Sequence, residues 1–352
     1  MAKLRLSSLL NDNPDNLRSK IICQYGLLLA FNLGAWIWAI KEFHHSPLLL
    51  GTAVLAYSLG LRHAVDADHI AAIDNVTRKL MQDGKRPVAV GLMFSLGHST
   101  IVLVGSAFIA QTALLTNRWF SAIRSWGSLV GPLISAFFLF AIAIVNITVL
   151  CTVYQEFRRV RRGEAGEIQD VDFILCSGGL LARVIRPLFA MIDRSWQMYP
   201  LGILFGLGFD TATEVAVLSI SAVEGSKGMS LWAVLIFPAL FAAGMALVDA
   251  TDNTLMLGAY GWAFVKPVRK LYYNLTITSA SVVVAFIIGG IEILGLAGEH
   301  FHLRSKFWKF VVEINSNFGE LGYLVVAVFI LSWIVSVVVY KWRGFDSLGL
   351  ES

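Results

Sequence analysis

The sequence contains little charge for its length, and its apolar residues are gathered into long runs. Charged residues make up 15% of the 352 positions and hydrophobic residues 57%, and the mean hydropathy is +0.69. Two soluble domains would fit this length but would need more charge on their surfaces, whereas a run of about 20 apolar residues crosses a bilayer as a helix. The composition therefore indicates an all-α, polytopic membrane protein surrounded by the lipid bilayer.

Cysteines are scarce, and two familiar enzyme motifs are absent. The three cysteines, Cys23, Cys151 and Cys176, show no CxxC spacing, which argues against a disulfide framework and against a thiolate metal cluster. The sequence has no Walker A motif, so the chain itself does not consume ATP, and it has no HExxH motif. No small-residue cleavage site follows the first apolar run, and we expect no removable signal peptide.

Eight apolar segments are long enough to cross a membrane. They cover approximately residues 21–40, 48–70, 88–110, 129–151, 200–222, 231–254, 275–298 and 321–340. The longest connection, residues 152–199, separates the fourth segment from the fifth. We expect residues 1–352 to form a single integral membrane domain with about eight transmembrane helices.

The distribution of Lys and Arg predicts the orientation of these helices. Of the 28 basic residues, 20 lie in the N-terminal segment, in the connections after the second, fourth and sixth segments, and at the C-terminus. Only seven lie in the alternate connections, and one, Arg62, lies within a segment. Because basic loops stay on the cytoplasmic side, both termini are expected to be cytoplasmic. This asymmetry also accounts for the net charge of +4 without a nucleic-acid partner.

The second apolar segment carries an unusual concentration of ionisable residues. Each Asp or Arg at the centre of a membrane helix costs about 2.5–3.5 kcal/mol, so such residues are kept where they pair or act. No Gly or Pro interrupts residues 61–74, which predicts a continuous helix. On such a helix His63, Asp66 and His69 share one face, and Asp68 points elsewhere unless the turn is distorted. An ion pair between Arg62 and Asp66 is the alternative, but it leaves the two histidines unexplained.

Imidazole and carboxylate groups together predict a metal site. Nitrogen and oxygen ligands of this kind suit borderline cations such as Ni²⁺, Co²⁺, Zn²⁺ or Fe²⁺, whereas Mg²⁺ and Ca²⁺ prefer oxygen alone. A further imidazole is available in the third segment, for which hydrogen-bonded packing is the alternative role. The candidate ligands are therefore His63, Asp66, Asp68, His69 and His98. Four loop histidines are weaker candidates: His44, His45, His300 and His302.

Further acidic residues lie within the fifth and sixth segments. In the fifth, two acids continue a stripe of Gly202 and Gly206 at four-residue spacing, and such glycines let another helix approach closely. In the sixth, two acids and an amide share a face. These candidates for a second station or an exit pathway are Asp210, Glu214, Asp249, Asp252 and Asn253. Since Arg62 is the one basic residue in the apolar segments, either external cations neutralise these acids or some acids are protonated.

Four motifs resemble those of the single-component nickel/cobalt transporter family, NiCoT. They occupy residues 62–70, 94–102, 207–214 and 244–253, in the family's order. The resemblance implies an eight-span, multi-pass permease of the bacterial cytoplasmic membrane that carries Ni²⁺ or Co²⁺ inward, with no cofactor besides the transported ion. It also implies that His63, Asp68 and His69 are central to metal recognition. The fourth motif departs from the family pattern at Ala250 and Asn253, which bears on substrate preference. The sequence indicates no oligomeric state.

Two other functions compete with metal uptake. An intramembrane metalloenzyme could hold the same His and Asp residues around a catalytic metal. Against it, the acids are spread over three segments in the manner of a pathway, and no separate nucleophile is evident. A proton- or sodium-coupled carrier of organic solutes would not require three histidines.

Overall fold

The protein is helical throughout the part of the chain that its structure describes. This computed structural model describes residues 10–112, 132–141, scattered positions between 143 and 158, and residues 192–207, 211–263, 267–303 and 305–342. Every regular element in these ranges is a helix, which confirms the all-α prediction. The elements are α1 (Leu17–Phe43), α2 (Pro47–His63), α3 (Ala67–Gln82), α4 (Val90–Thr112), η2 (Ser195–Gln197), α8 (Met198–Gly206), α9 (Ala212–Ser226), α10 (Leu231–Val234), α11 (Ile236–Ala263), α12 (Pro267–His300), α13 (Lys306–Ser316) and α14 (Phe318–Trp342).

Several of these helices are long and apolar enough to span a bilayer. Among the described residues four helices qualify singly, and up to six spans result if the bent pairs α2–α3 and α13–α14 each count as one. This finding supports a multi-pass membrane protein. The predicted count of eight and the cytoplasmic termini remain predictions, because the fourth expected segment is only partly described and the fifth is divided between α8 and α9.

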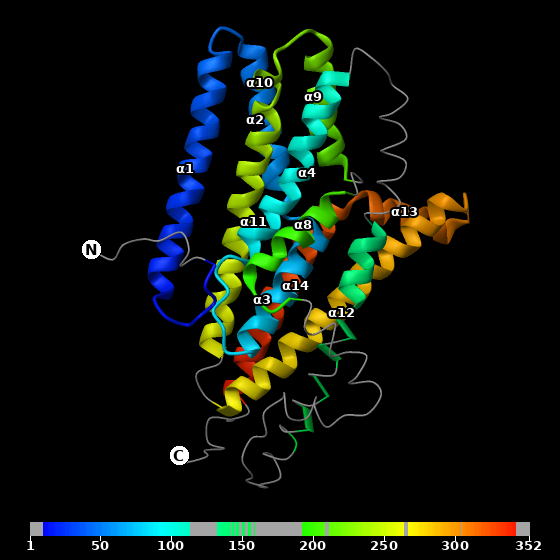
Figure 1. Ribbon diagram of the computed structural model, residues 1–352. Coiled ribbons are helices and arrows are strands. Elements are labelled where there is room, and N and C mark those ends of the chain that lie inside the picture. Colours follow the sequence, from blue (N-terminus) through cyan, green and yellow to red (C-terminus); the bar gives the residue numbers. More distant parts are fainter. Residues whose placement is uncertain are drawn as a thin grey trace.

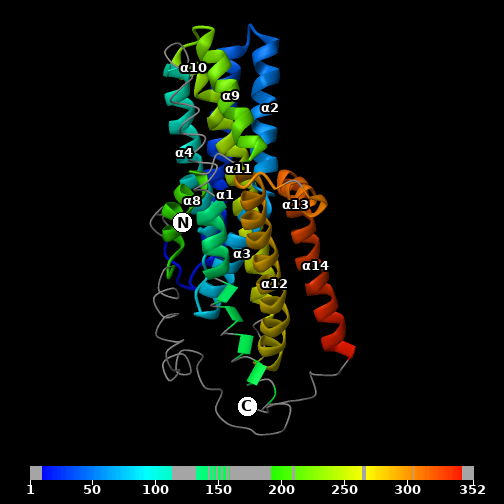
Figure 2. The ribbon, with the colours of Figure 1, turned by 90° about the vertical axis from the view of Figure 1, so that its right-hand side faces the viewer.

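The central helix of the fold is α11. It packs against α1, α2, α3, α4 and α9, and Figures 1 and 2 show α2, α4, α9 and α10 around one half of the molecule and α3, α12 and α14 around the other. A helix that is apolar on all sides belongs in a protein core or in a membrane, and Phe237, Leu240 and Phe241 of α11 are fully buried by the surrounding helices. This arrangement brings α11 beside both α2 and α3.

The second predicted span is broken where its ionisable residues lie. Helix α2 ends at His63, α3 begins at Ala67, and the two helices are bent by 51°. The prediction of a continuous helix through residues 61–74 is therefore wrong. Asp66 is the N-cap of α3 with extended backbone angles, φ −63° and ψ 144°, and Asp68 lies in the first turn. Acidic residues at these positions favour starting a new helix.

A second break separates α8 from α9 and completes the framework of the site. Thr211 is the N-cap of α9, and its side chain accepts a hydrogen bond from the backbone N–H of Glu214. Helix α8 lies against α4 at glycines. A Cβ on Gly202 would overlap the carbonyl oxygen of Phe94, and one on Gly97 would overlap that of Tyr199. The close helix approach expected from Gly202 is thus confirmed.

Candidate metal centre

Three histidines from three different helices converge at the first break. His63 ends α2, His69 lies in the first turn of α3, and His98 lies on α4. Their ring centroids are 4.6, 4.8 and 4.9 Å apart, and one ligand nitrogen from each lies within 4.8 Å of the others. All three are at most 3% exposed. Within the described ranges they form the only group of three or more potential ligands that meets this distance.

Two carboxylates orient the imidazoles toward a common centre. His63 Nδ1 lies 2.9 Å from Asp66 Oδ2, and His69 Nδ1 lies 3.4 Å from Asp249 Oδ1. When Nδ1 donates to a carboxylate, Nε2 carries the free lone pair and the ring orientation is fixed. Asp66 therefore acts on His63, and its partner is this histidine rather than Arg62, which is exposed. The Arg62–Asp66 ion-pair alternative is wrong.

A fourth group, Glu214, faces the same centre. Its Oε1 lies 2.7 Å from His98 Nε2 and 4.0 Å from His63 Nε2, and its Oε2 accepts a hydrogen bond from Thr211 Oγ1 at 3.0 Å. The sequence predicts that Glu214 belongs to a second station or an exit pathway, whereas the structure brings it against the histidines. The Thr-x-x-Glu pattern at 211–214, typical of a helix start, is the signal that points to this break.

Several buried polar atoms of the centre have no hydrogen-bond partner. They include His69 Nε2, His98 Nδ1, Asp68 Oδ1 and Asp249 Oδ2. Native proteins rarely leave such groups unsatisfied, because each one costs about 1–3 kcal/mol. Asp68 also lies close enough to His63, Asp66 and Glu214 to interact with them electrostatically, so the bend directs it toward the centre. A cation bound among the histidines would give His69 Nε2 the partner that it lacks.

The ends of four helix segments surround the histidines. The C-terminal ends of α2 and α8 carry backbone carbonyls, and the N-terminal ends of α3 and α9 carry acidic side chains in their first turns. A helix C-terminus has negative partial charge, and acids are stabilised at a helix N-terminus. Discontinuous membrane helices place such ends at ion sites in transporters. The local field therefore favours a cation.

The remaining predicted pathway residues lie at different places. Asn253 donates to the carbonyls of Pro87 and Val88 and accepts from Thr77 Oγ1 at 2.6 Å, so its amide joins α3, α11 and the start of α4. Asp252, three residues after Asp249 on α11, has a buried Oδ2 without a hydrogen-bond partner. Asp210 lies outside the described residues.

Comparison with protein families now assigns the chain. The NicO family, described as high-affinity nickel-transport protein, matches residues 49–339, a range that includes every residue of the metal centre. The chain belongs to the NicO family. This is a family of nickel transporters rather than enzymes, which decides against the intramembrane metalloenzyme. The match also agrees with the NiCoT resemblance of the four sequence motifs.

Named NicO relatives are similar over nearly the whole chain. A "High-affinity nickel transport protein" of Cupriavidus necator is 57% identical over 329 residues, covering 94% of each chain. The "Hydrogenase nickel incorporation protein HupN" of Bradyrhizobium diazoefficiens is 48% identical, covering 93% of this chain and 85% of the relative. The "Cobalt transport protein NhlF" of Rhodococcus rhodochrous is 40% identical, covering 81% of each. No solved structure is significantly similar to the chain.

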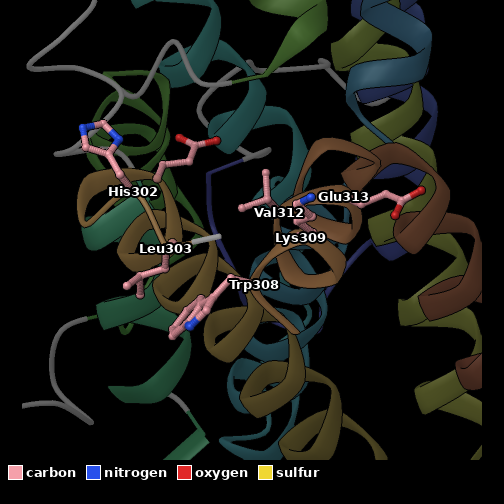
Figure 3. A pocket seen from close by; sticks show the side chains of 8 residues that line it. His302, Leu303, Trp308, Lys309, Val312 and Glu313 are labelled. Atoms are coloured by element: carbon pink, nitrogen blue, oxygen red, sulfur yellow. The ribbon is translucent and has the colours of Figure 1, made fainter. Parts of the chain in front are cut away.

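A surface cavity elsewhere on this NicO chain contains one of the weaker histidine candidates. It has a volume of about 490 Å³ and lies between the end of α12 and α13, lined by residues that include Glu299, His302, Lys309 and Glu313. Figure 3 shows His302 and Glu313 at opposite sides of the cavity, with their side chains turned away from each other. These groups do not converge on one point, in contrast to the three buried histidines.

Proposed function

We propose that this protein is a secondary transporter that takes up Ni²⁺ or Co²⁺, with the ion bound by His63, His69, His98 and Glu214. One observation carries the proposal: three buried imidazoles and a carboxylate converge between two broken helices. The printed names of the NicO relatives, which include nickel and cobalt transport proteins, support the same substrate class.

The chemistry of the ligand set supports these two ions. Imidazole and carboxylate suit Ni²⁺ and Co²⁺, and among the described residues the group of potential ligands contains no thiolate, which would favour softer ions. His63 Nε2 and His98 Nε2 are 2.9 Å apart. Two nitrogens bonded to a metal at about 2.0–2.1 Å are separated by about 2.9 Å at a right angle and by about 3.4 Å in a tetrahedron. One ion could therefore bind both nitrogens with only a small change in their separation.

A second station for the ion follows from the remaining acids. Asp249 orients His69 through Oδ1 while its Oδ2 has no hydrogen-bond partner, and buried oxygens of Asp68 and Asp252 are also unpartnered. Since Asp249 and Asp252 are three residues apart on α11, they lie on one face of that helix. An ion released by the histidines would meet these carboxylates next.

The membrane potential can drive this uptake. A potential of about 100 mV is worth about 2.3 kcal/mol per elementary charge, so a divalent ion gains about 4.6 kcal/mol. This gain supports an ion gradient of about three orders of magnitude without ATP. We place the transporter in the bacterial cytoplasmic membrane with eight spans and both termini inside, and it needs no cofactor because the metal ion is its cargo.

Uptake of ⁶³Ni²⁺ by cells expressing the chain tests the proposal. His63→Ala and His69→Ala should each abolish accumulation at nanomolar Ni²⁺, because each variant removes one ligand. His44→Ala, which changes an exposed histidine, is the matched control and should accumulate nickel normally. Co²⁺ should compete with Ni²⁺ more effectively than Zn²⁺ or Mn²⁺. Normal accumulation by both site variants would refute the proposal.

A further inference from the structure

A buried arginine, Arg78, lies on the same helix as one of three acids near the proposed metal centre. These acids, Asp249, Asp252 and Asp74, are called the acidic row. Asp249 and Asp252 lie on α11, Asp74 lies farther along the adjacent α3, and Arg78 lies one turn beyond Asp74. Arg78 is 1% exposed. A fixed positive charge at the end of a cation pathway opposes the passage of a cation, so its presence there requires an explanation.

Asp74 is already well supplied with neutral donors. Its Oδ2 accepts a hydrogen bond from Ser281 Oγ at 2.7 Å, and its Oδ1 accepts one from the Tyr260 hydroxyl. The nearest approach to Arg78 is 3.9 Å, from Nε to Oδ2. A hydrogen-bonded pair of guanidinium and carboxylate has a separation of about 2.7–2.9 Å. Arg78 is therefore close to Asp74 but is not hydrogen-bonded to it.

Arg78 itself makes few hydrogen bonds. Its Nη2 donates to Asn75 Oδ1 at 2.7 Å, while Nε and Nη1 are buried and have no acceptor. A guanidinium has five N–H donors, and buried donors of this kind are normally satisfied. If the Arg78 guanidinium left its present position, it would lose few hydrogen bonds. The neighbouring Lys79 differs, because its Nζ donates to the carbonyl of Ile192.

A candidate acceptor for these donors lies on α11, which packs against α3. Asp252 has a buried, unpartnered Oδ2 and lies close enough to Asp74 to repel it electrostatically. In the described part of the chain Asp252 forms no ion pair with Arg78 in this state. The two packed helices α3 and α11 thus carry an acid without a counter-charge, Asp252, and a cation without a full set of acceptors, Arg78.

We propose that Arg78 is the internal counter-cation of the acidic row. When the row releases its metal ion, the guanidinium moves from Asp74 to Asp252 and neutralises the emptied carboxylate. A new ion arriving at Asp252 returns Arg78 to Asp74. The inference rests on the proposed function, because an internal counter-charge is needed only if a cation leaves the row in each cycle. Without Arg78 the empty transporter would have to reorient with uncompensated buried charge.

Comparing net uptake with ion exchange distinguishes a counter-cation role of Arg78 from a purely structural role. Net uptake requires the empty transporter to return, whereas exchange of Ni²⁺ for Ni²⁺ proceeds with the site loaded in both directions. Arg78→Gln in proteoliposomes should lower net ⁶³Ni²⁺ uptake at least about tenfold and change ⁶³Ni²⁺/Ni²⁺ exchange less than about twofold. Adding Asp252→Asn to Arg78→Gln should restore part of the ratio of net uptake to exchange, because it removes the uncompensated acid.

Two controls accompany the assay. Arg78→Lys keeps the charge and should keep the ratio of net uptake to exchange. Lys79→Gln removes an adjacent charge outside the row and should also keep it. If Arg78→Gln reduces both modes equally, or leaves net uptake unchanged, the inference is overturned while the proposed function stands. Loss of both modes in the unmodified protein would instead overturn the proposed function.

A measurement on the unmodified protein decides the case if Arg78→Gln does not fold. A cryo-electron microscopy structure of the full chain, metal-free and open to the inside, should place the Arg78 guanidinium within hydrogen-bond distance of Asp252. Retention of the present contact with Asn75 in that state would overturn the inference.

Discussion

In the proposed metal centre, some residues would face the ion and others would orient them. His63 and His69 each present Nε2 to the centre because a carboxylate holds Nδ1, Asp66 for one and Asp249 for the other. Glu214 faces the histidines directly, which adds negative charge where a dication would sit. The acids therefore have different roles, either orienting a histidine or facing the ion, and replacing them should weaken Ni²⁺ binding for different reasons.

Replacing Asp66 by Asn should weaken Ni²⁺ binding through His63. An amide can donate to Nδ1, which would leave the proton on Nε2 and block its lone pair. Loss of such an orienting carboxylate typically lowers metal affinity about 10–100-fold. Equilibrium ⁶³Ni²⁺ binding to the purified protein measures this change. Asp12→Asn, which alters a buried acid bonded to the distant Ser195, is the control, and equal affinity of the two variants would contradict the assignment.

Replacing Glu214 by Gln should also weaken Ni²⁺ binding, by about tenfold or more, because a charged ligand becomes neutral. Glu224 is a suitable control, since it lies on the same helix and pairs with Lys227 at 2.7 Å, away from the histidines. Calorimetric titration with Ni²⁺ compares Glu214→Gln with Glu224→Gln. If both variants bind as the unmodified protein does, Glu214 is not a ligand.

At the level of elements, the two helix breaks create the centre. The apolar runs predicted α1, α4, α11 and α12 well, because burial in lipid requires long uninterrupted helices. The breaks were not predicted, since helical periodicity alone assumes continuity, although Asp66 and the Thr211–Glu214 pattern are both typical of helix starts. The pairing of His69 with Asp249 depends on the packing of α3 against α11, which no local pattern encodes.

The first break is held by a close contact with α14. A Cβ on Gly322 would overlap the carbonyl oxygen of Val65, which lies between α2 and α3. Gly322→Ala should therefore displace the break and reduce Ni²⁺ uptake about tenfold or more, because packed interiors tolerate no such overlap. Uptake normalised to the amount of protein in the membrane measures the effect.

The matched control for this contact is Gly290→Ala on α12, where an added Cβ meets no atom within 4 Å. It should transport at the normal rate. If Gly322→Ala transports as well as this control, α14 does not hold the break.

At the level of the whole molecule, the chain buries its proposed metal centre within a multi-pass helical bundle. The central α11 supplies Asp249 to the centre and contacts both α2 and α3, so movement of these helices would alter the site directly. The three histidines are almost fully buried, so the proposed centre is shielded from solvent in this structure. Transport requires this bundle to open toward each side in turn.

The predicted topology has eight spans and both termini in the cytoplasm. Reporter fusions active on only one side of the membrane should place both ends of the chain inside and the connection after the first helix, near Ser46, outside. The physical basis is the excess of Lys and Arg in alternate connections. Termini on opposite sides would mean an odd number of spans and would contradict this prediction.

X-ray absorption spectroscopy of the nickel-loaded protein tests the central claim most directly, because it reports the ligands of the ion itself. The spectrum should show imidazole scattering from about three histidines and a first shell of nitrogen and oxygen at about 2.0–2.1 Å. His98→Ala should remove about one imidazole from that shell. A first shell of oxygen alone, or one unchanged in His98→Ala, would contradict the claim that these histidines hold the transported ion.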